Sequence, residues 1–157
     1  MNDLTELMNF TYNLCEDEDY EDAIQYFDAI LSKEPKNIII LNDKGVTLHN
    51  LNKNKEAIHC YDQVLKIDPK NIDALINKGT VLHGLGKFRQ AIQYYDLALI
   101  SNKDSPRALT YKGISLGELG QIEEALGYFE KALKMDKEYD LAVNSKETAL
   151  ELLKKKN

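Results

Sequence analysis

The sequence predicts an all-α solenoid built from antiparallel helix pairs. The main evidence is a 34-residue period, because glycine recurs at Gly45, Gly79 and Gly113. A fixed period of this length is typical of proteins in which one helical unit stacks on the next. Two further columns keep the same period, namely Ala23, Ala57, Ala91 and Ala125, and Phe27, Tyr61, Tyr95 and Phe129.

Each unit has the pattern of two helices. In the unit that begins at Ile38, apolar and small residues recur every three or four positions, which places them on one side of a helix. For the first helix of this unit these residues are Leu41, Gly45 and Leu48, and for the second they are Ala57, Tyr61 and Val64. Short turn-prone segments lie between the two stripes at 50–54, 84–86 and 117–120. Turns of this length force neighbouring helices to run antiparallel.

Good N-cap residues occupy the start of each unit, at Asp3, Asn37, Asn71 and Ser105. We therefore predict one domain over residues 1–157, with repeats at 4–37, 38–71, 72–105 and 106–139 and a capping helix at 140–155. In the capping helix we expect Val143, Leu150 and Leu153 to form the buried stripe, with Ala142 and Ala149 beside it.

The glycine column predicts a close contact between helices. Glycine inside a helix costs roughly 1 kcal/mol relative to alanine, so a compensating approach of the partner helix is expected. We expect the alanine that follows each glycine on the second helix, such as Ala57 after Gly45, to form the other half of that contact.

These residues resemble the signature of the tetratricopeptide repeat (TPR) family, which in the second unit reads Leu41, Gly45, Leu48, Ala57, Tyr61 and Pro69. The resemblance covers nearly the whole chain, from about Leu4 to Tyr139. It implies a right-handed superhelix whose first helices line a concave groove, and a non-catalytic module for protein–protein interaction.

The first helices carry a mixed apolar and polar set of side chains where a face left to water would be more polar. We predict that this set binds a peptide or partner surface. Its members are Met8, Tyr12, Ile39, Asn42, Val46, His49, Asp73, Ile76, Asn77, Thr80, His83, Arg107, Thr110, Tyr111 and Ile114. The alternative is that these residues fill the inside of a tight superhelix, since surface apolar residues are common.

A well-known TPR subgroup binds the terminal carboxylate of chaperone tails through lysine, asparagine and arginine side chains. Carried onto this sequence, the resemblance places Asn42, Val46, Asn77, Arg107 and Tyr111 at those positions. Only Asn77 matches and only Arg107 keeps a charge, so most of the charge-assisted contacts are missing. The sequence therefore argues against chaperone-tail binding.

Cys15, His49 and His83 share the twelfth position of three successive units and form a row of possible metal ligands. Packed helices are roughly 8–10 Å apart, whereas ligands converge at about 2 Å from one ion. We predict polar groups lining a groove, with no metal and no other cofactor.

Composition and charge exclude other classes of function. The formal net charge is -6 and no basic stripe is present, which disfavours nucleic acid as the partner. No apolar run approaches the roughly 18 residues of a membrane span, and the sequence lacks a signal-like start, so we expect a cytoplasmic protein. A self-associating scaffold is the alternative function, with Leu97 and Ile100 on an outward face, in a monomer or weak homo-oligomer.

Overall fold

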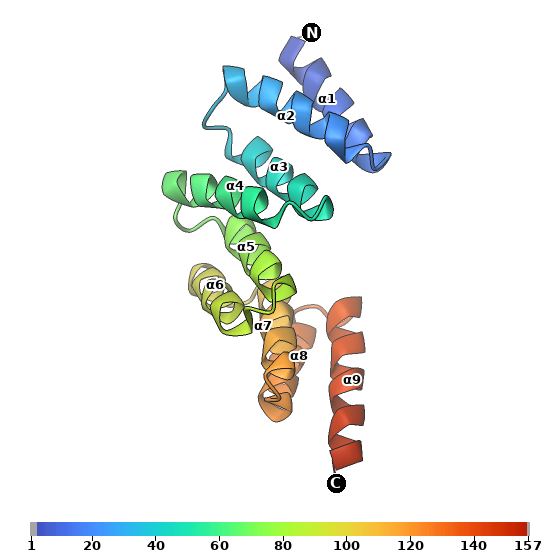
Figure 1. The fold of residues 1–157 in the computed structure, drawn as a ribbon. Coiled ribbons are helices and arrows are strands. Elements are labelled where there is room, and N and C mark those ends of the chain that lie inside the picture. Colours follow the sequence, from blue (N-terminus) through green and yellow to red (C-terminus); the bar gives the residue numbers. More distant parts are fainter. Residues whose placement is uncertain (1–2, 157) are drawn as a thin grey trace. The chain divides into compact units, whose positions relative to one another are not determined.

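The computed structural model describes residues 3–156, and all regular secondary structure in that range is helical (Figure 1). This confirms the all-α prediction. The helices are α1 (Asp3–Glu16), α2 (Tyr20–Lys33), α3 (Ile38–Asn50), α4 (Asn54–Ile67), α5 (Ile72–Gly84), α6 (Phe88–Ser101), α7 (Pro106–Glu118), α8 (Ile122–Met135) and α9 (Asp140–Lys156). None of them has the length and apolar content that a bilayer crossing requires.

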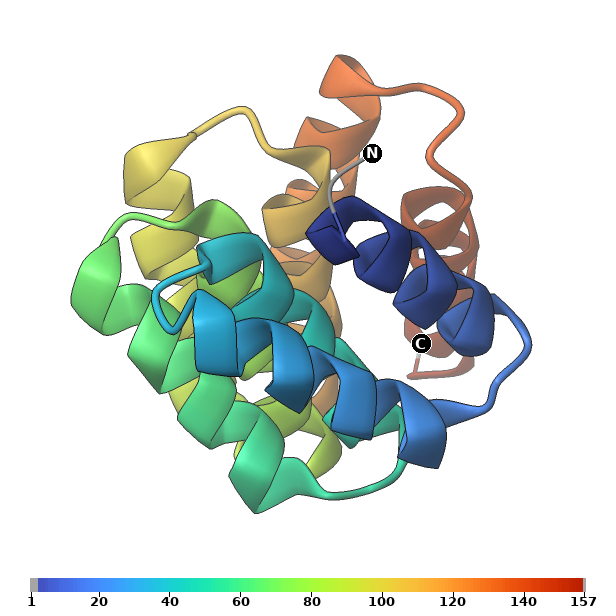
Figure 2. The ribbon, with the colours of Figure 1, turned by 90° about the horizontal axis from the view of Figure 1, so that it is seen from above.

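The chain forms two compact units, Met1–Ala74 and Leu75–Asn157, with the boundary inside α5. Within each unit, successive helices such as α1 and α2 or α7 and α8 lie side by side as antiparallel hairpins (Figures 1 and 2). Each unit has its own apolar core, centred on Phe27 in the first and on Phe129 in the second. A single domain over residues 1–157 stays a prediction.

The predicted N-caps are confirmed at three positions. The side chains of Asn37, Asn71 and Ser105 accept hydrogen bonds from backbone N–H groups three residues later, at 3.2, 3.0 and 3.3 Å. These bonds satisfy donors that a helix start leaves without a partner. The side chain of Asp3, the fourth predicted cap, lies outside the described residues.

The turn inside each hairpin needs one residue in the left-handed region of backbone space. The residues with positive φ are Glu18 (62°), Asn52 (58°), Gly86 (71°) and Gly120 (78°), which occupy equivalent places in successive repeats. Glycine adopts this conformation without steric cost, whereas a side chain is strained there. Two of the four turns therefore carry strain that glycine removes in the other two.

The glycine column packs against the aromatic column, whereas the sequence pattern assigned this contact to alanine. A Cβ atom added to Gly45, Gly79 or Gly113 would lie 2.5 Å from a ring carbon of the aromatic residue on the following helix. Those rings belong to Tyr61, Tyr95 and Phe129, which are 1%, 0% and 3% exposed. The alanines are also buried, but the ring takes the space that glycine leaves.

A lysine–acid pair recurs between a second helix and the first helix that follows it. Lys44 pairs with Asp28, and the Nζ atom of Lys112 lies 2.6 Å from Asp96 Oδ1. The same ammonium group lies 4.4 Å from the centre of the Tyr128 ring. Burial acts to lower the pKa of Lys112, but hydrogen bonds to Asp96 and Tyr128 raise it above 10.5. The charged Lys112 side chain is thus held between α6 and α7.

The capping helix α9 continues the register of the repeats. Its Lys146 occupies the position of Lys112 in the next repeat and pairs with Glu130 of α8 at 3.2 Å. Ala142 and Ala149 are 0% and 5% exposed, while Leu150 is 41% exposed. The predicted stripe through Leu150 is therefore wrong, because α9 turns its alanines toward α7 and α8.

Candidate partner-binding surfaces

In the first unit, α3 exposes two apolar side chains from the predicted set. Ile39 and Val46 are 62% and 40% exposed, although both are branched aliphatic residues that favour burial. Met8 and Tyr12 of α1 are half-buried in the same unit. This α1–α3 surface combines accessible aliphatic groups with polar neighbours.

Polar contacts hold the first helices of this unit together. The Tyr12 hydroxyl donates to Asp43 Oδ2 at 2.8 Å, and Asn42 Nδ2 donates to Asn71 Oδ1 at 3.2 Å. Burial raises the pKa of Asp43 above 3.8, the hydrogen bond from Tyr12 opposes the shift, and the charge of Asp73 adds to it. Burial also raises the pKa of Tyr12, so its hydroxyl stays a donor.

In the second unit, a ring stack joins α6 to α7 and a polar pair joins α5 to α7. Tyr111 stacks on Tyr95 with ring centroids 5.9 Å apart and planes at 20°. Arg107 donates a hydrogen bond to Asn77 Oδ1. Burial raises the pKa of Tyr95 to about 12. The predicted residues Asn77, Arg107 and Tyr111 are brought together here and fill this part of the surface.

The three residues of the predicted Cys–His row each have a separate local partner. His83 Nδ1 lies 2.8 Å from Ser115 Oγ, His49 Nδ1 lies 2.8 Å from Asn54 Oδ1, and Cys15 Sγ lies 3.6 Å from the Thr47 hydroxyl. Burial lowers the pKa of His83 below 6.5, against the nearby charge of Glu118. Across residues 3–156, no three acidic, histidine or cysteine side chains cluster as metal ligands would.

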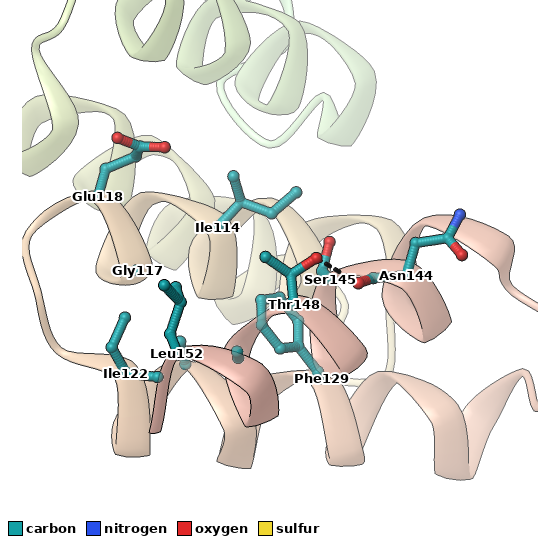
Figure 3. Close-up of a pocket in the computed structure, with 11 residues that line it drawn as sticks. Ile114, Gly117, Glu118, Ile122, Phe129, Asn144, Ser145, Thr148 and Leu152 are labelled. Atoms are coloured by element: carbon teal, nitrogen blue, oxygen red, sulfur yellow. Dashed lines mark hydrogen bonds between the residues drawn. The ribbon is translucent and has the colours of Figure 1, made fainter. Parts of the chain in front are cut away.

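A cavity of about 400 Å³ opens between α7, α8 and α9 (Figure 3). We call it the C-terminal pocket, and its lining residues are Ile114, Gly117, Glu118, Ile122, Ala125, Phe129, Asn144, Ser145, Thr148, Ala149 and Leu152. The lower wall comes from Ile122 and Phe129 of α8, and Glu118 and Asn144 lie at opposite ends in Figure 3. The Thr148 hydroxyl donates to the Asn144 carbonyl at 2.9 Å.

Two family models match this sequence. One describes a TPR repeat and matches residues 47–86, and the other describes a tetratricopeptide repeat and matches residues 76–140. Together the matches run over more than half of the chain. The chain belongs to the tetratricopeptide repeat family. A search of curated proteins returned no match to this TPR chain.

Solved structures share the fold. A MamA fragment from Desulfovibrio magneticus is 23% identical, with 99% of this chain and 94% of that chain covered and a TM-score of 0.77. The first TPR domain of human RPAP3 is 27% identical, with 78% and 96% covered and a TM-score of 0.73. The first TPR of Spaghetti (RPAP3), bound to the HSP90 peptide SRMEEVD, is 27% identical, with 74% and 92% covered and a TM-score of 0.69.

Two members of the predicted set do not belong to an accessible surface. Ile76 is 1% exposed and Thr110 is 0% exposed, so the expectation that they contact a partner is wrong. Both occupy the fifth position of their repeats, and Thr110 turns its hydroxyl to the Pro106 carbonyl of its own helix at 2.8 Å. Thr80 is half-buried and donates to the Ile76 carbonyl at 3.0 Å.

The sequence prediction missed the contribution of α9 to the C-terminal pocket. Asn144, Ser145, Thr148 and Leu152 line it together with the predicted Ile114. The 34-residue period contained evidence for this pocket. Ser145 is the repeat equivalent of Tyr111, and Gly117 is the repeat equivalent of His83. Small residues at two positions that hold rings one repeat earlier indicate an opening.

Proposed function

We propose that this TPR protein is an interaction module that binds a peptide or a partner's surface on its first helices. The observation that carries the proposal is the exposure of Ile39 and Val46 on α3. Aliphatic side chains on an interaction helix gain free energy when a partner removes them from water. TPR families generally serve as non-catalytic interaction modules, and we assign this chain no reaction.

A solved relative supports peptide binding as the mode. The Spaghetti (RPAP3) domain, 27% identical, holds the HSP90 peptide SRMEEVD. That peptide is acidic, and such tails need several cations in the site. Among the positions that correspond to a carboxylate clamp, Arg107 is the cation, and it already donates to Asn77. We therefore propose a different peptide chemistry for this chain.

Capture of partners from native lysate tests the proposal. The wild type and an Ile39→Ser/Val46→Ser variant are used as bait, and the recovered proteins are quantified by mass spectrometry. Ile67→Ser is the matched control, because Ile67 is 44% exposed at the end of the second helix α4. We expect partners to be lost with the double variant and kept with the control. Identical recovery with all three baits would contradict the proposal.

Self-association is the second candidate. Leu97 and Ile100 on α6 are 47% and 79% exposed, whereas the equivalent positions of α8 hold Lys131 and Lys134. An apolar patch in place of lysines favours contact between copies. Light scattering over a concentration series tests it, and a mass that stays monomeric at high concentration would exclude it. A cytoplasmic location stays a prediction from the sequence.

A further inference from the structure

The C-terminal pocket lies between α7, α8 and α9, at a place where the preceding repeat holds two side-chain rings. One repeat earlier, the Tyr111 ring stacks on Tyr95 at 5.9 Å, and the His83 ring lies 5.0 Å from the ring of Phe88. His83 also lies 2.8 Å from the Ser115 hydroxyl. These contacts fill the space between α5, α6 and α7.

The same seam one repeat later is open. Phe129 replaces Tyr95 and Ile122 replaces Phe88, so the wall on α8 is retained. Ser145 stands where Tyr111 would be, and Gly117 stands where His83 would be. No heavy atom lies within 4 Å of a Cβ placed on Gly117, and the cavity measures about 400 Å³. The open space therefore lies where the preceding repeat holds the rings of His83 and Tyr111.

We propose that the C-terminal pocket binds an aromatic side chain of a partner peptide, with a lysine or arginine of that peptide beside Glu118. This inference rests on the proposed function and names the ligand of one part of the surface. The aromatic ring takes the place of the Tyr111 ring and lies against Ile114, Ile122 and Leu152, above the buried Phe129 ring. Removing the faces of an aromatic ring and of these aliphatic side chains from water favours binding.

Electrostatics select a basic neighbour for that ring. Glu118 is the last residue of α7, where the carbonyl end of the helix carries partial negative charge. Its side chain is exposed, and it is the residue that brings a charge to the pocket lining. Lys154 and Lys155 follow Leu152 on α9, but neither lines the pocket. A cation is therefore attracted, whereas an acidic peptide is repelled.

The experiment uses the full chain and three synthetic pentapeptides, each acetylated and amidated so that no terminal charge remains. The first has a central tyrosine between lysine and arginine, the second replaces both basic residues with glutamate, and the third replaces tyrosine with serine. Titration is followed by ¹H–¹⁵N NMR to millimolar peptide, which detects weak binding. We expect the first peptide to shift the amides of Gly117, Ser145 and Thr148, and to bind at least tenfold more tightly than the others.

Variants separate pocket binding from other binding. Ser145→Tyr restores the ring found one repeat earlier, so we expect an unchanged or higher melting temperature and at least a tenfold loss of affinity for the first peptide. Leu150→Tyr adds the same side chain to an exposed position of α9 outside the pocket, and should leave affinity unchanged. Glu118→Gln should reduce the preference for the basic over the acidic peptide at least threefold.

Two results would overturn the inference. Equal binding of the three peptides, or no binding by any, would show that the pocket has no aromatic and basic preference. Binding that Ser145→Tyr leaves intact would place the peptide elsewhere. Either result leaves the proposed function to its own test, because lysate capture with the Ile39→Ser/Val46→Ser variant depends on a surface in the first unit.

Discussion

The glycine column offers a test of how the hairpins pack. In Gly113→Ala, the new Cβ would lie 2.5 Å from Cε1 of Phe129, well inside ordinary van der Waals contact. Because Phe129 is 3% exposed, its ring has little room to move away. Gly127 is the matched control, since it lies inside α8 of the same unit and has no heavy atom within 4 Å of an added Cβ.

Gly113→Ala should be less stable than Gly127→Ala. Alanine is better than glycine in a helix by roughly 1 kcal/mol, so Gly127→Ala should raise the free energy of unfolding by up to that amount. Gly113→Ala has the same gain but also overpacks the core, which typically costs about 1–3 kcal/mol. The difference between the variants isolates the clash, and we expect about 1–3 kcal/mol.

Urea unfolding followed by circular dichroism measures both free energies, and the slope with denaturant checks that the unfolding reaction is unchanged. Phe129→Leu should reduce the penalty of Gly113→Ala in the double variant, because the ring that meets the new methyl group is gone. Equal stability of Gly113→Ala and Gly127→Ala would refute the proposed ring contact. So would a penalty for Gly113→Ala that persists in the Phe129→Leu background.

Three further predictions concern the turns, a buried acid and the capping helix. Gly120→Ala should lower the free energy of unfolding by about 1 kcal/mol, because a backbone φ of 78° is strained for any residue with a side chain. Urea unfolding measures this free energy, and an unchanged value would contradict the turn geometry. Burial raises the pKa of Asp43, so the folded state binds this proton more tightly, and its stability falls as pH rises from 3.8 through the raised value. Asp43→Asn keeps an acceptor for Tyr12, so its stability relative to wild type should rise over that pH window in urea unfolding, whereas a constant difference would count against the shift. Ala142→Leu should overpack the seam of the capping helix by about 1–3 kcal/mol and speed amide hydrogen exchange in α9, while unchanged exchange would show that α9 docks otherwise.

The sequence identified the packed columns but not the atoms that meet. The repeat period placed Gly45 and Tyr61 on facing sides of a hairpin, and both are buried. The sequence pattern indicated Ala57 and not Tyr61 for this contact, because periodicity specifies the direction of a Cβ and not the reach of the side chain. An aromatic ring extends well beyond the reach of a methyl group, so Tyr61 contacts Gly45 first.

Exposure could be predicted from the sequence where it depends on a single helix, while partner binding there stays a prediction. Ile39 and Val46 are exposed as expected for the side of α3 that faces away from α4. It failed at Thr110, because the fifth position of a first helix also faces the neighbouring first helices. Burial there depends on how successive repeats pack, which a helical wheel of one repeat does not contain.

The period itself, once known, shows where this protein differs from a regular stack. Residues that keep the period, such as Gly113 and Phe129, pack directly against each other between the paired helices. The C-terminal pocket exists because Gly117 and Ser145 break the pattern set by His83 and Tyr111, while Phe129 keeps it. A seam with an intact wall and missing rings is complementary to a partner that supplies a ring. The proposed preference for an aromatic side chain therefore rests on the two positions that depart from the repeat, Gly117 and Ser145.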